Sequence, residues 1–109
     1  MTDLKDKKCE VCEGGLTPLN EIEASKKIEE IPGWSLDKDH KSIMRKFSFK
    51  GFYATMGFVN AVAYIAQKEG HHPDMEVGFN YCNIKFLTHA IGGLSENDFI
   101  CAAKINAIL

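Results

Sequence analysis

Three of the four histidines in this chain of 109 residues stand where they could move protons together. His71 and His72 are neighbours, with Gly70 before them and Pro73 after them, and His89 follows further along the chain. A glycine can end a helix in the left-handed conformation, and a proline forces the residue before it into an extended one. The pair is therefore expected on a stiffened corner. Because a neutral imidazole accepts a proton and a protonated one donates it near neutral pH, the candidate chemistry is proton transfer.

The residues after the pair predict a β-hairpin that brings His89 back to it. Alternating apolar residues favour strands within 75–79 and 84–88, and residues 80–83 are the expected turn. The two open ends of a hairpin lie together, so His89 should lie beside the pair. Three converging imidazoles call for a reason, because protonated histidines repel one another.

Two other interpretations of these histidines stay open at this point. Histidines in surface loops are commonly tolerated without any role. Three histidines can also hold a catalytic zinc ion. Neighbouring residues on an extended chain direct their side chains apart, however, and the usual i, i+2 or i, i+4 spacing of ligands is absent. We therefore favour proton transfer and expect no metal at the pair.

The remaining elements must position this corner, and their order predicts an α+β fold. The expected elements are a helix over 20–31, two strands around a polar turn at 37–41, a helix over 52–68, the hairpin, and a helix from Ser95. Asn20 and Glu23 form a candidate capping box at the start of the first helix. This order is typical of a four-stranded antiparallel sheet with three helices packed on one face.

Helical spacing also predicts which residues are buried. Ile22, Ile28 and Ile31 give the first helix a modest apolar side, so it should lie on a surface. The residues with helical spacing in the next helix are Phe52, Thr55, Phe58, Val59, Val62, Ile65 and Ala66, and those of the buried side of the last helix are Phe99, Ala102, Ala103, Ile108 and Leu109. The helix over 52–68 carries a second apolar side with Tyr53, Met56 and Tyr64. A second face of this kind favours contact with a partner subunit.

Composition and charge exclude several classes of protein. Thirteen Lys and Arg against fifteen Asp and Glu give a net charge of -2, without the concentrated positive face that nucleic acid requires. No apolar run approaches the ~20 residues that span a bilayer, and the first residues lack a secretory segment. We expect a cytoplasmic protein that contacts neither nucleic acid nor membrane. Residues 1–18 are polar and predict a mobile or loosely docked tail before a single domain over 19–109.

The four cysteines are expected to be thiols in a reducing cytosol. Cys9 and Cys12 supply half of a zinc site, and no second pair follows at ligand spacing, so a metal or redox module is an alternative function. Cys82 is expected in the hairpin turn and Cys101 in the last helix, where small buried thiols are common.

Several pieces of the chain together resemble one known family. The run HHPDMEVGF, with Phe79 at its end, is followed by His89 and then by Asp98. EGHHP, IPGW and THAIGGLSENDF are further matching pieces. This pattern is similar to the signature of the pterin-4a-carbinolamine dehydratases, known in animals also as a dimerisation cofactor of a homeodomain transcription factor. The similarity covers about residues 20–109, and the predicted order of elements matches the fold of that family.

The resemblance implies a reaction, a substrate and a set of roles. Such enzymes remove water from a 4a-hydroxytetrahydropterin to give quinonoid dihydropterin, which supports tetrahydropterin recycling for an aromatic amino-acid hydroxylase. By analogy His71 and His89 are the general acid and base, in an order that the sequence leaves open. The residues implied in substrate binding are His72, Pro73, Gln67 and Phe79. No metal or organic cofactor is implied, and the expected assembly is a homodimer or homotetramer.

Two positions qualify this resemblance. The family commonly has glutamate where this chain has Gln67, with Glu69 two residues nearer to the histidines. Glutamine can hydrogen-bond but cannot stabilise an imidazolium by charge, so we expect a weaker activity or a shifted pH optimum. Ser95 and Asp98 have the spacing of a capping box, which explains Asp98 as structural, and a role at the site is the alternative.

A competing function is a dimerising accessory protein without enzymatic activity. The second apolar side of the helix over 52–68 favours it, with the histidines kept as a relic. Replacing His71 and His89 by Ala separates the two hypotheses, because an accessory role would survive.

Overall fold

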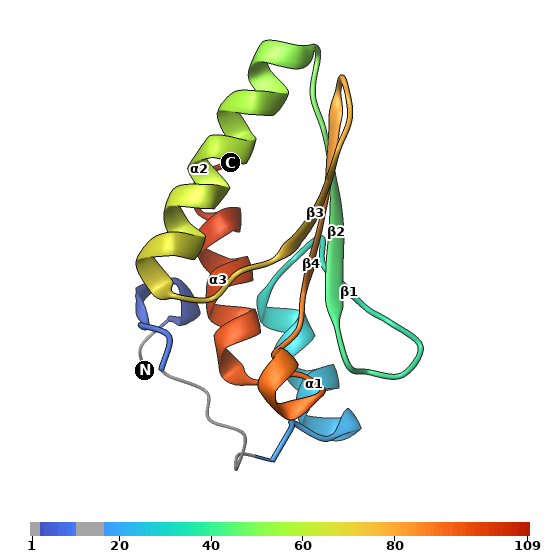
Figure 1. Cartoon of the computed structure of the whole chain (residues 1–109). Helices are drawn as coiled ribbons and strands as arrows, with labels where there is room; N and C mark the ends of the chain where they lie inside the picture. Colours follow the sequence, from blue (N-terminus) through green and yellow to red (C-terminus); the bar gives the residue numbers. More distant parts are fainter. Residues whose placement is uncertain (1–2, 11–16) are drawn as a thin grey trace.

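The computed structural model describes residues 3–10 and 17–109 of the chain. Three α-helices and four strands follow one another there in the predicted order, which confirms the α+β class (Figure 1). Their bounds are α1 Glu21–Lys27, β1 Ser35–Leu36, β2 Ile43–Ser48, α2 Phe52–Glu69, β3 Asp74–Val77, β4 Tyr81–Phe86 and α3 Glu96–Asn106. Three 3-10 turns accompany them: η1 Leu4–Asp6, η2 Ile28–Glu30 and η3 His89–Ile91. No helix within these ranges has the length and apolar character that crossing a bilayer needs.

The four strands form one antiparallel sheet in the order β1-β2-β4-β3. The helices lie on one of its faces, and the other face is open (Figure 1). Alternation along β2 and β4 directs buried residues toward the helices. In the register, Ile43 lies opposite Phe86 and Phe47 opposite Cys82, and all four side chains are buried. This shared face is the sheet side of the core.

The first helix begins as predicted. The Asn20 side chain accepts from the Glu23 backbone at 2.8 Å, and the Asn20 backbone donates to the Glu23 side chain at 3.0 Å. Ile22, on the modest apolar side of this surface helix, is 69% exposed. Ala24 is the residue that this short helix buries, and Ile31 reaches the core only after the turn η2.

Helix α2 packs on the sheet through the predicted side. Its fully or nearly buried residues are Thr55, Phe58, Val62 and Ala66. Phe52, expected on the same side, is 54% exposed. It is the first residue of the helix, and its ring stacks on Phe79 at the hairpin turn, with centroids 6.4 Å apart, instead of entering the core. Tyr53 and Tyr64 on the second side are 92% and 68% exposed.

Helix α3 lies at the centre of the core, with residues 97–102 all buried. The prediction that Ile108 and Leu109 continue its buried side is wrong, since they are 47% and 62% exposed. The helix ends at Asn106, whose side-chain oxygen accepts from the Trp34 indole at 2.9 Å and from the Arg45 guanidinium at 2.7 Å. These bonds fix the end of α3 on the strands, so the chain beyond turns into solvent.

The turn of the second hairpin lies earlier than the sequence analysis placed it. Strand β3 ends at Val77 and β4 begins at Tyr81, so the turn is residues 78–80, and Gly78 N donates to Tyr81 O at 2.9 Å. Cys82 is therefore a buried strand residue, not a turn residue, because it continues the inward alternation of β4. The open ends of the hairpin still meet at the histidine corner.

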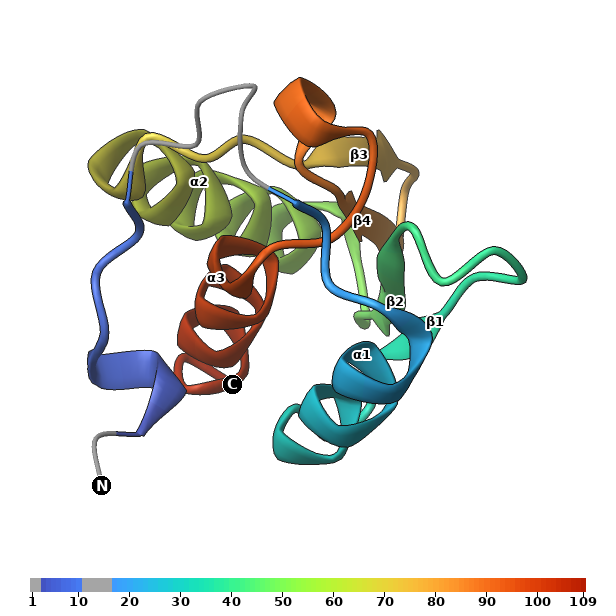
Figure 2. The same cartoon turned by 90° about the horizontal axis from the view of Figure 1, so that it is seen from below.

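Residues 3–10, here called the N-terminal segment, are packed against α3 (Figure 2). Leu4 is 6% exposed and belongs to the core. Lys104 donates to the backbone oxygen of Lys5 at 2.8 Å, and Lys7 pairs with Glu96 at 3.3 Å. Residues 3–10 are thus docked more firmly than the expected loosely docked tail. The reason is the apolar side chain of Leu4, which is buried in the core although its neighbours in the sequence are polar.

Candidate active site

The histidine pair lies on the corner between α2 and β3. Gly70 ends the helix in the left-handed conformation, with φ 66°, and His71 N donates back to Ala66 O at 3.1 Å. Pro73 then leads directly into β3. The corner separates the two imidazoles, since the His71 side chain is only 11% exposed while His72 is exposed. Gly70 therefore ends the helix in the conformation that the sequence predicted.

The ring of His71 is held in one orientation. Its Nε2 lies 2.5 Å from Oδ1 of Asp98, whose side chain is fully buried at the start of α3. Its plane is nearly parallel to the Phe86 ring, at 9° and a centroid distance of 5.7 Å. A hydrogen bond at one edge and an aromatic ring on one face leave little freedom to rotate.

Asp98 uses its second oxygen for the structural role that its spacing predicted. Oδ2 accepts from the Ser95 backbone and from the Thr88 hydroxyl, both at 2.9 Å, and the capping box of α3 is present. The hydroxyls of Thr88 and Ser95 are 2.7 Å apart. The cap and the contact with His71 therefore coexist, one on each carboxylate oxygen.

This network determines what His71 can do. When Asp98 is ionised, its carboxylate only accepts, so Nε2 of His71 must carry the proton of their hydrogen bond. The lone pair of a neutral ring is then on Nδ1, which is free to take a proton from a ligand. A buried carboxylate behind an imidazole both orients the ring and stabilises the imidazolium that forms. An imidazole placed in this way is able to act as a general base, with the carboxylate as its positioning partner.

All three predicted histidines line one hollow of about 370 Å³. We call it the histidine hollow, and its walls include His71, His72, His89, Thr88, Glu69 and Cys9. His89 comes from η3, directly after Thr88, and is exposed. Gly92 ends this turn in the left-handed conformation, with φ 65°. The hairpin thus brings together imidazoles that are far apart in sequence.

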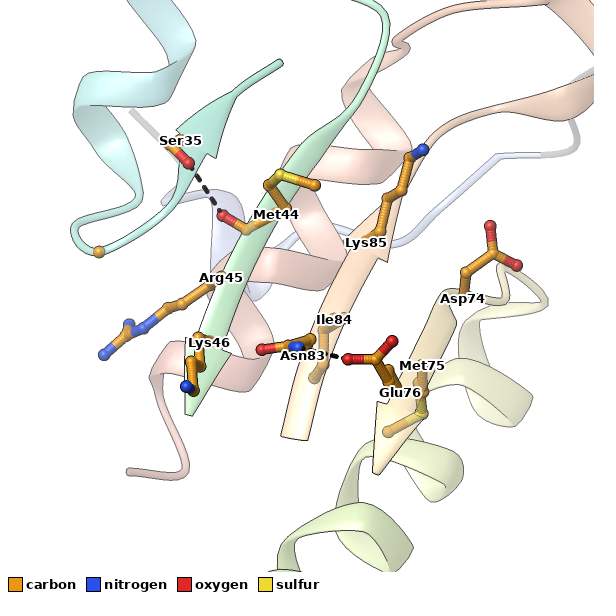
Figure 3. A pocket seen from close by; sticks show the side chains of 11 residues that line it. Ser35, Met44, Arg45, Lys46, Asp74, Met75, Glu76, Asn83, Ile84 and Lys85 are labelled. Carbon is orange, nitrogen blue, oxygen red and sulfur yellow. Dashed lines mark hydrogen bonds between the residues drawn. The ribbon is translucent and has the colours of Figure 1, made fainter. Parts of the chain in front are cut away.

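A larger hollow of about 580 Å³ lies on the open face of the sheet (Figure 3). Its walls, which define the open-face hollow, include Met44, Lys46, Met75, Glu76, Asn83 and Lys85. Asn83 donates to the Glu76 carboxylate at 2.9 Å across β4 and β3. Among the described residues that line it, none is a histidine or a cysteine.

The cysteines divide between the core and the N-terminal segment. Cys9 Sγ lies 3.5 Å from Cys101 Sγ. The hydrogen bond with the Cys9 thiol, together with burial, raises the pKa of the Cys101 thiol, and burial raises the pKa of Cys82. Within residues 3–10 and 17–109, no group of three or more His, Cys, Asp or Glu is spaced to hold a metal ion. Cys12, and with it the hypothesis of a Cys9–Cys12 module, lies outside the described residues.

Comparison with known proteins decides the family. The sequence profile of Pterin 4 alpha carbinolamine dehydratase matches residues 17–108. The chain belongs to this family. A relative from Nitrosomonas europaea that provisionally carries the name pterin-4-alpha-carbinolamine dehydratase is 55% identical over 97% of this chain and 93% of its own length. A relative from Legionella pneumophila with the same provisional name is 51% identical over 99% of this chain and 96% of its own length.

Solved structures of two dehydratase-like proteins share the fold. A transcriptional coactivator/pterin dehydratase from Brucella melitensis has a TM-score of 0.80 and 33% identity, over 84% of this chain and 98% of that chain. A pterin dehydratase-like protein described as a RuBisCO assembly factor in the alpha-carboxysome has a TM-score of 0.61 and 25% identity, over 70% of this chain and 88% of that chain. Proteins of this fold thus carry names of more than one kind of function.

The structure does not bring every residue implied by the dehydratase resemblance to the histidine hollow. Gln67 is exposed and does not line it. Phe79 lies in the turn at the far end of the hairpin, 66% exposed beside Phe52. Pro73 is half-buried at the corner and shapes it through its backbone. Their roles in substrate binding stay predictions.

Several lining residues of the histidine hollow were not predicted from sequence, among them Glu69, Thr88, Glu10 and Asn97. Glu69 had a signal, because it continues the inward face of Val62 and Ala66 at helical spacing. Thr88 lies opposite His71 when the register of β3 and β4 is continued past Asp74 and Lys85. Glu10 and Asn97 had no signal in the sequence, because only tertiary packing brings them together.

Proposed function

We propose that the chain catalyses the dehydration of a 4a-hydroxytetrahydropterin to quinonoid dihydropterin in the histidine hollow. The observation that carries this proposal is the hollow itself, where three imidazoles meet and a buried carboxylate stands behind His71. Membership of the dehydratase family supports the substrate class. The reaction moves two protons, one from N5 of the pterin and one to the departing 4a hydroxyl, and it requires neither metal nor organic cofactor.

We assign the base to His71 and the acid to His89. Asp98 stabilises the positive charge that His71 acquires when Nδ1 takes the N5 proton. His89 is exposed and exchanges protons with water, which suits the donor to the leaving hydroxyl. The electron pair of the N5–H bond forms the new C4a=N5 bond as the C4a–O bond breaks, and water leaves. His72 is assigned to hydrogen bonding of the bound pterin.

The proposed cellular role follows from the product. Quinonoid dihydropterin is reduced to tetrahydropterin, so the chain would support recycling for an aromatic amino-acid hydroxylase in the cytoplasm. The exposed tyrosines on α2, Tyr53 and Tyr64, support association into a homodimer or homotetramer.

The direct test follows the decay of enzymatically generated 4a-hydroxytetrahydropterin by absorbance, with and without the protein. The expected result is a decay that accelerates in proportion to protein concentration. A rate equal to the spontaneous one would contradict the proposed function.

An accessory role without catalysis is the second candidate. The exposed side of α2 and the coactivator name of the Brucella melitensis relative favour it. Replacing both His71 and His89 by Ala discriminates between the two. Association measured by sedimentation should persist in this variant under either role, whereas dehydration should be lost only if the histidines catalyse it.

A further inference from the structure

The N-terminal segment forms one wall of the histidine hollow. Cys9 and Glu10 line it together with His71, His72 and His89. The family profile begins at residue 17, so this wall comes from a part of the chain outside the family's shared core. The solved Brucella melitensis chain is in turn matched over 98% of its length by only 84% of this chain. Cys9 and Glu10 are therefore lining residues of the hollow that the region matched by the family profile does not contain.

Two buried side chains fasten this wall at its backbone. Asn97, 6% exposed, accepts from Glu10 N at 3.0 Å and donates to Glu10 O at 2.6 Å. Glu69, whose side chain is 7% exposed, accepts from Cys9 N at 2.9 Å. Asn97 precedes Asp98 on α3, and Glu69 stands two residues before His71. Both fastening residues are thus built into the elements that carry the proton-transfer residues.

We propose that Cys9 and Glu10 are part of the pterin-binding site and that Asn97 and Glu69 are positioning residues that hold them there. This inference rests on the proposed function. Binding sites for small molecules cover most of the ligand surface, and a hollow open on this side would cover less of it. Because the wall touches substrate and transition state alike, its loss should raise KM and leave kcat nearly unchanged.

Loss of the fastening bonds should act locally. Leu4 remains in the core, and Lys104 still holds the Lys5 backbone, so the start of the N-terminal segment stays docked. Truncating Asn97 releases the backbone of Glu10, while the Cys9 thiol keeps its contacts with the Asn97 backbone oxygen at 3.6 Å and with Cys101 Sγ at 3.5 Å. The effect on substrate binding can therefore be separated from unfolding.

The first experiment compares steady-state dehydration by wild type, Asn97→Ala and Lys27→Ala. Asn97→Ala removes both bonds to Glu10 and should raise KM about tenfold with kcat within about twofold. Lys27→Ala removes a surface ion pair with Glu96, at 3.2 Å on the same turn of α3, and should change neither constant. An Asn97→Ala variant with wild-type circular dichroism and an unchanged KM, or with a loss confined to kcat, would overturn the inference.

A pair of variants at Glu69 separates positioning from direct contact. Glu69→Gln keeps an oxygen that accepts from Cys9 N, so its KM should stay within about twofold of wild type. Glu69→Ala removes the acceptor and should raise KM as Asn97→Ala does. Equal impairment of both variants would overturn the positioning role through Cys9 N, because the charge of Glu69, which also pairs with Lys104 at 3.8 Å, would then be the property that matters.

A final readout does not depend on turnover. In a Cys12→Ser chain, alkylation of Cys9 by iodoacetamide is followed by mass spectrometry with and without 7,8-dihydrobiopterin, a ligand that carries no 4a hydroxyl. At about ten times its dissociation constant the ligand should slow labelling about tenfold, since only about a tenth of the chain stays free. Saturating ligand with an unchanged Cys9 rate would overturn the inference alone. A wild type that neither binds pterin nor accelerates dehydration would overturn the proposed function and this inference with it.

Discussion

The histidine hollow and the open-face hollow differ in what their polar groups can do. The open-face hollow is larger, about 580 Å³ against about 370 Å³, but none of the described side chains behind it is a buried carboxylate, and Lys46, Glu76 and the exposed bond between Asn83 and Glu76 face solvent. The histidine hollow has Asp98 with no exposure and Thr88 with 3% behind its wall. Catalysis requires groups fixed before the substrate arrives, which exposed flexible side chains do not supply. The histidine hollow is therefore the better candidate for the active site, although it is the smaller of the two.

The largest expected contrast comes from truncating either of two histidines in the histidine hollow and one carboxylate in the open-face hollow. His71→Ala and His89→Ala should each lower kcat for dehydration by about 10²- to 10⁴-fold, because each removes a general acid or base. Glu76→Ala in the open-face hollow should leave kcat and KM unchanged. Steady-state rates of the three variants check this. A Glu76→Ala variant as impaired as His71→Ala would reverse the assignment of the two hollows.

The next contrast concerns the buried carboxylate. Asp98→Asn keeps the shape but loses the charge, and a hydrogen bond to a charged group is worth about 1.5–3 kcal/mol. If that bond strengthens as His71 becomes protonated, kcat should fall about ten- to a hundredfold. Asp98→Ala also loses the helix cap and should lower the free energy of unfolding by about 3 kcal/mol. Denaturant titration gives the second value, and an Asp98→Asn variant with wild-type kcat would exclude the proposed partnership with His71.

A smaller effect is expected for the hydroxyl behind Asp98. Thr88→Val should lower the free energy of unfolding by about 1–2 kcal/mol, because Asp98 Oδ2 and the Ser95 hydroxyl each lose a partner. The matched control is Thr55→Val, which also removes a buried hydroxyl with two bonds, to Gly51 O and Phe79 O, but far along α2 from the histidine corner. Both variants should lose stability, and only Thr88→Val should also lose activity. Equal loss of activity would mean that stability alone matters.

The smallest effect concerns a carboxylate beside the open-face hollow. Burial raises the pKa of Asp37, but hydrogen bonds from Lys41 N and from Ser42, with the charge of Lys85, outweigh it and lower that pKa below 3.8. A lowered pKa in the folded state means that the ionised form stabilises the fold above the unfolded pKa, and that this contribution disappears as pH falls through the folded pKa. Asp37→Asn should therefore be less stable than wild type at pH 6, with the difference shrinking at pH 3. Urea titrations at both pH values measure it, and a difference independent of pH would contradict the assignment.

The sequence predicted the parts of the site that depend on local signals. Gly70 and Pro73 act on their own neighbours, so the corner was predictable, and hairpin geometry then placed His89. The predicted turn at 80–83 includes Tyr81 and Cys82, whereas the turn of the structure is residues 78–80, with Gly78 and Asn80 as the turn formers. The misplaced turn did not change which ends of the hairpin meet, because the open ends of β3 and β4 still lie together at the histidine corner.

The parts that the sequence did not predict depend on contacts between distant elements. Cys9 bonds to Glu69 and Glu10 bonds to Asn97, and each pair is separated by more than half of the sequence. Periodic patterns in the sequence do not predict such bonds. The family position at Gln67 was a poor guide for a similar reason. The phase of α2 turns residue 67 to solvent and residue 69 to the hollow.

The central claim is that a pterin binds in the histidine hollow and not on the open face. The most direct test is an NMR titration of the whole chain, labelled at histidine ring carbons and methionine methyl groups, with 7,8-dihydrobiopterin. The account predicts that ring signals of His71, His72 and His89 shift together, while His40 in the β1–β2 turn and Met44 in the open-face hollow stay unchanged. A shift of the Met44 methyl with silent histidines at residues 71, 72 and 89 would contradict it.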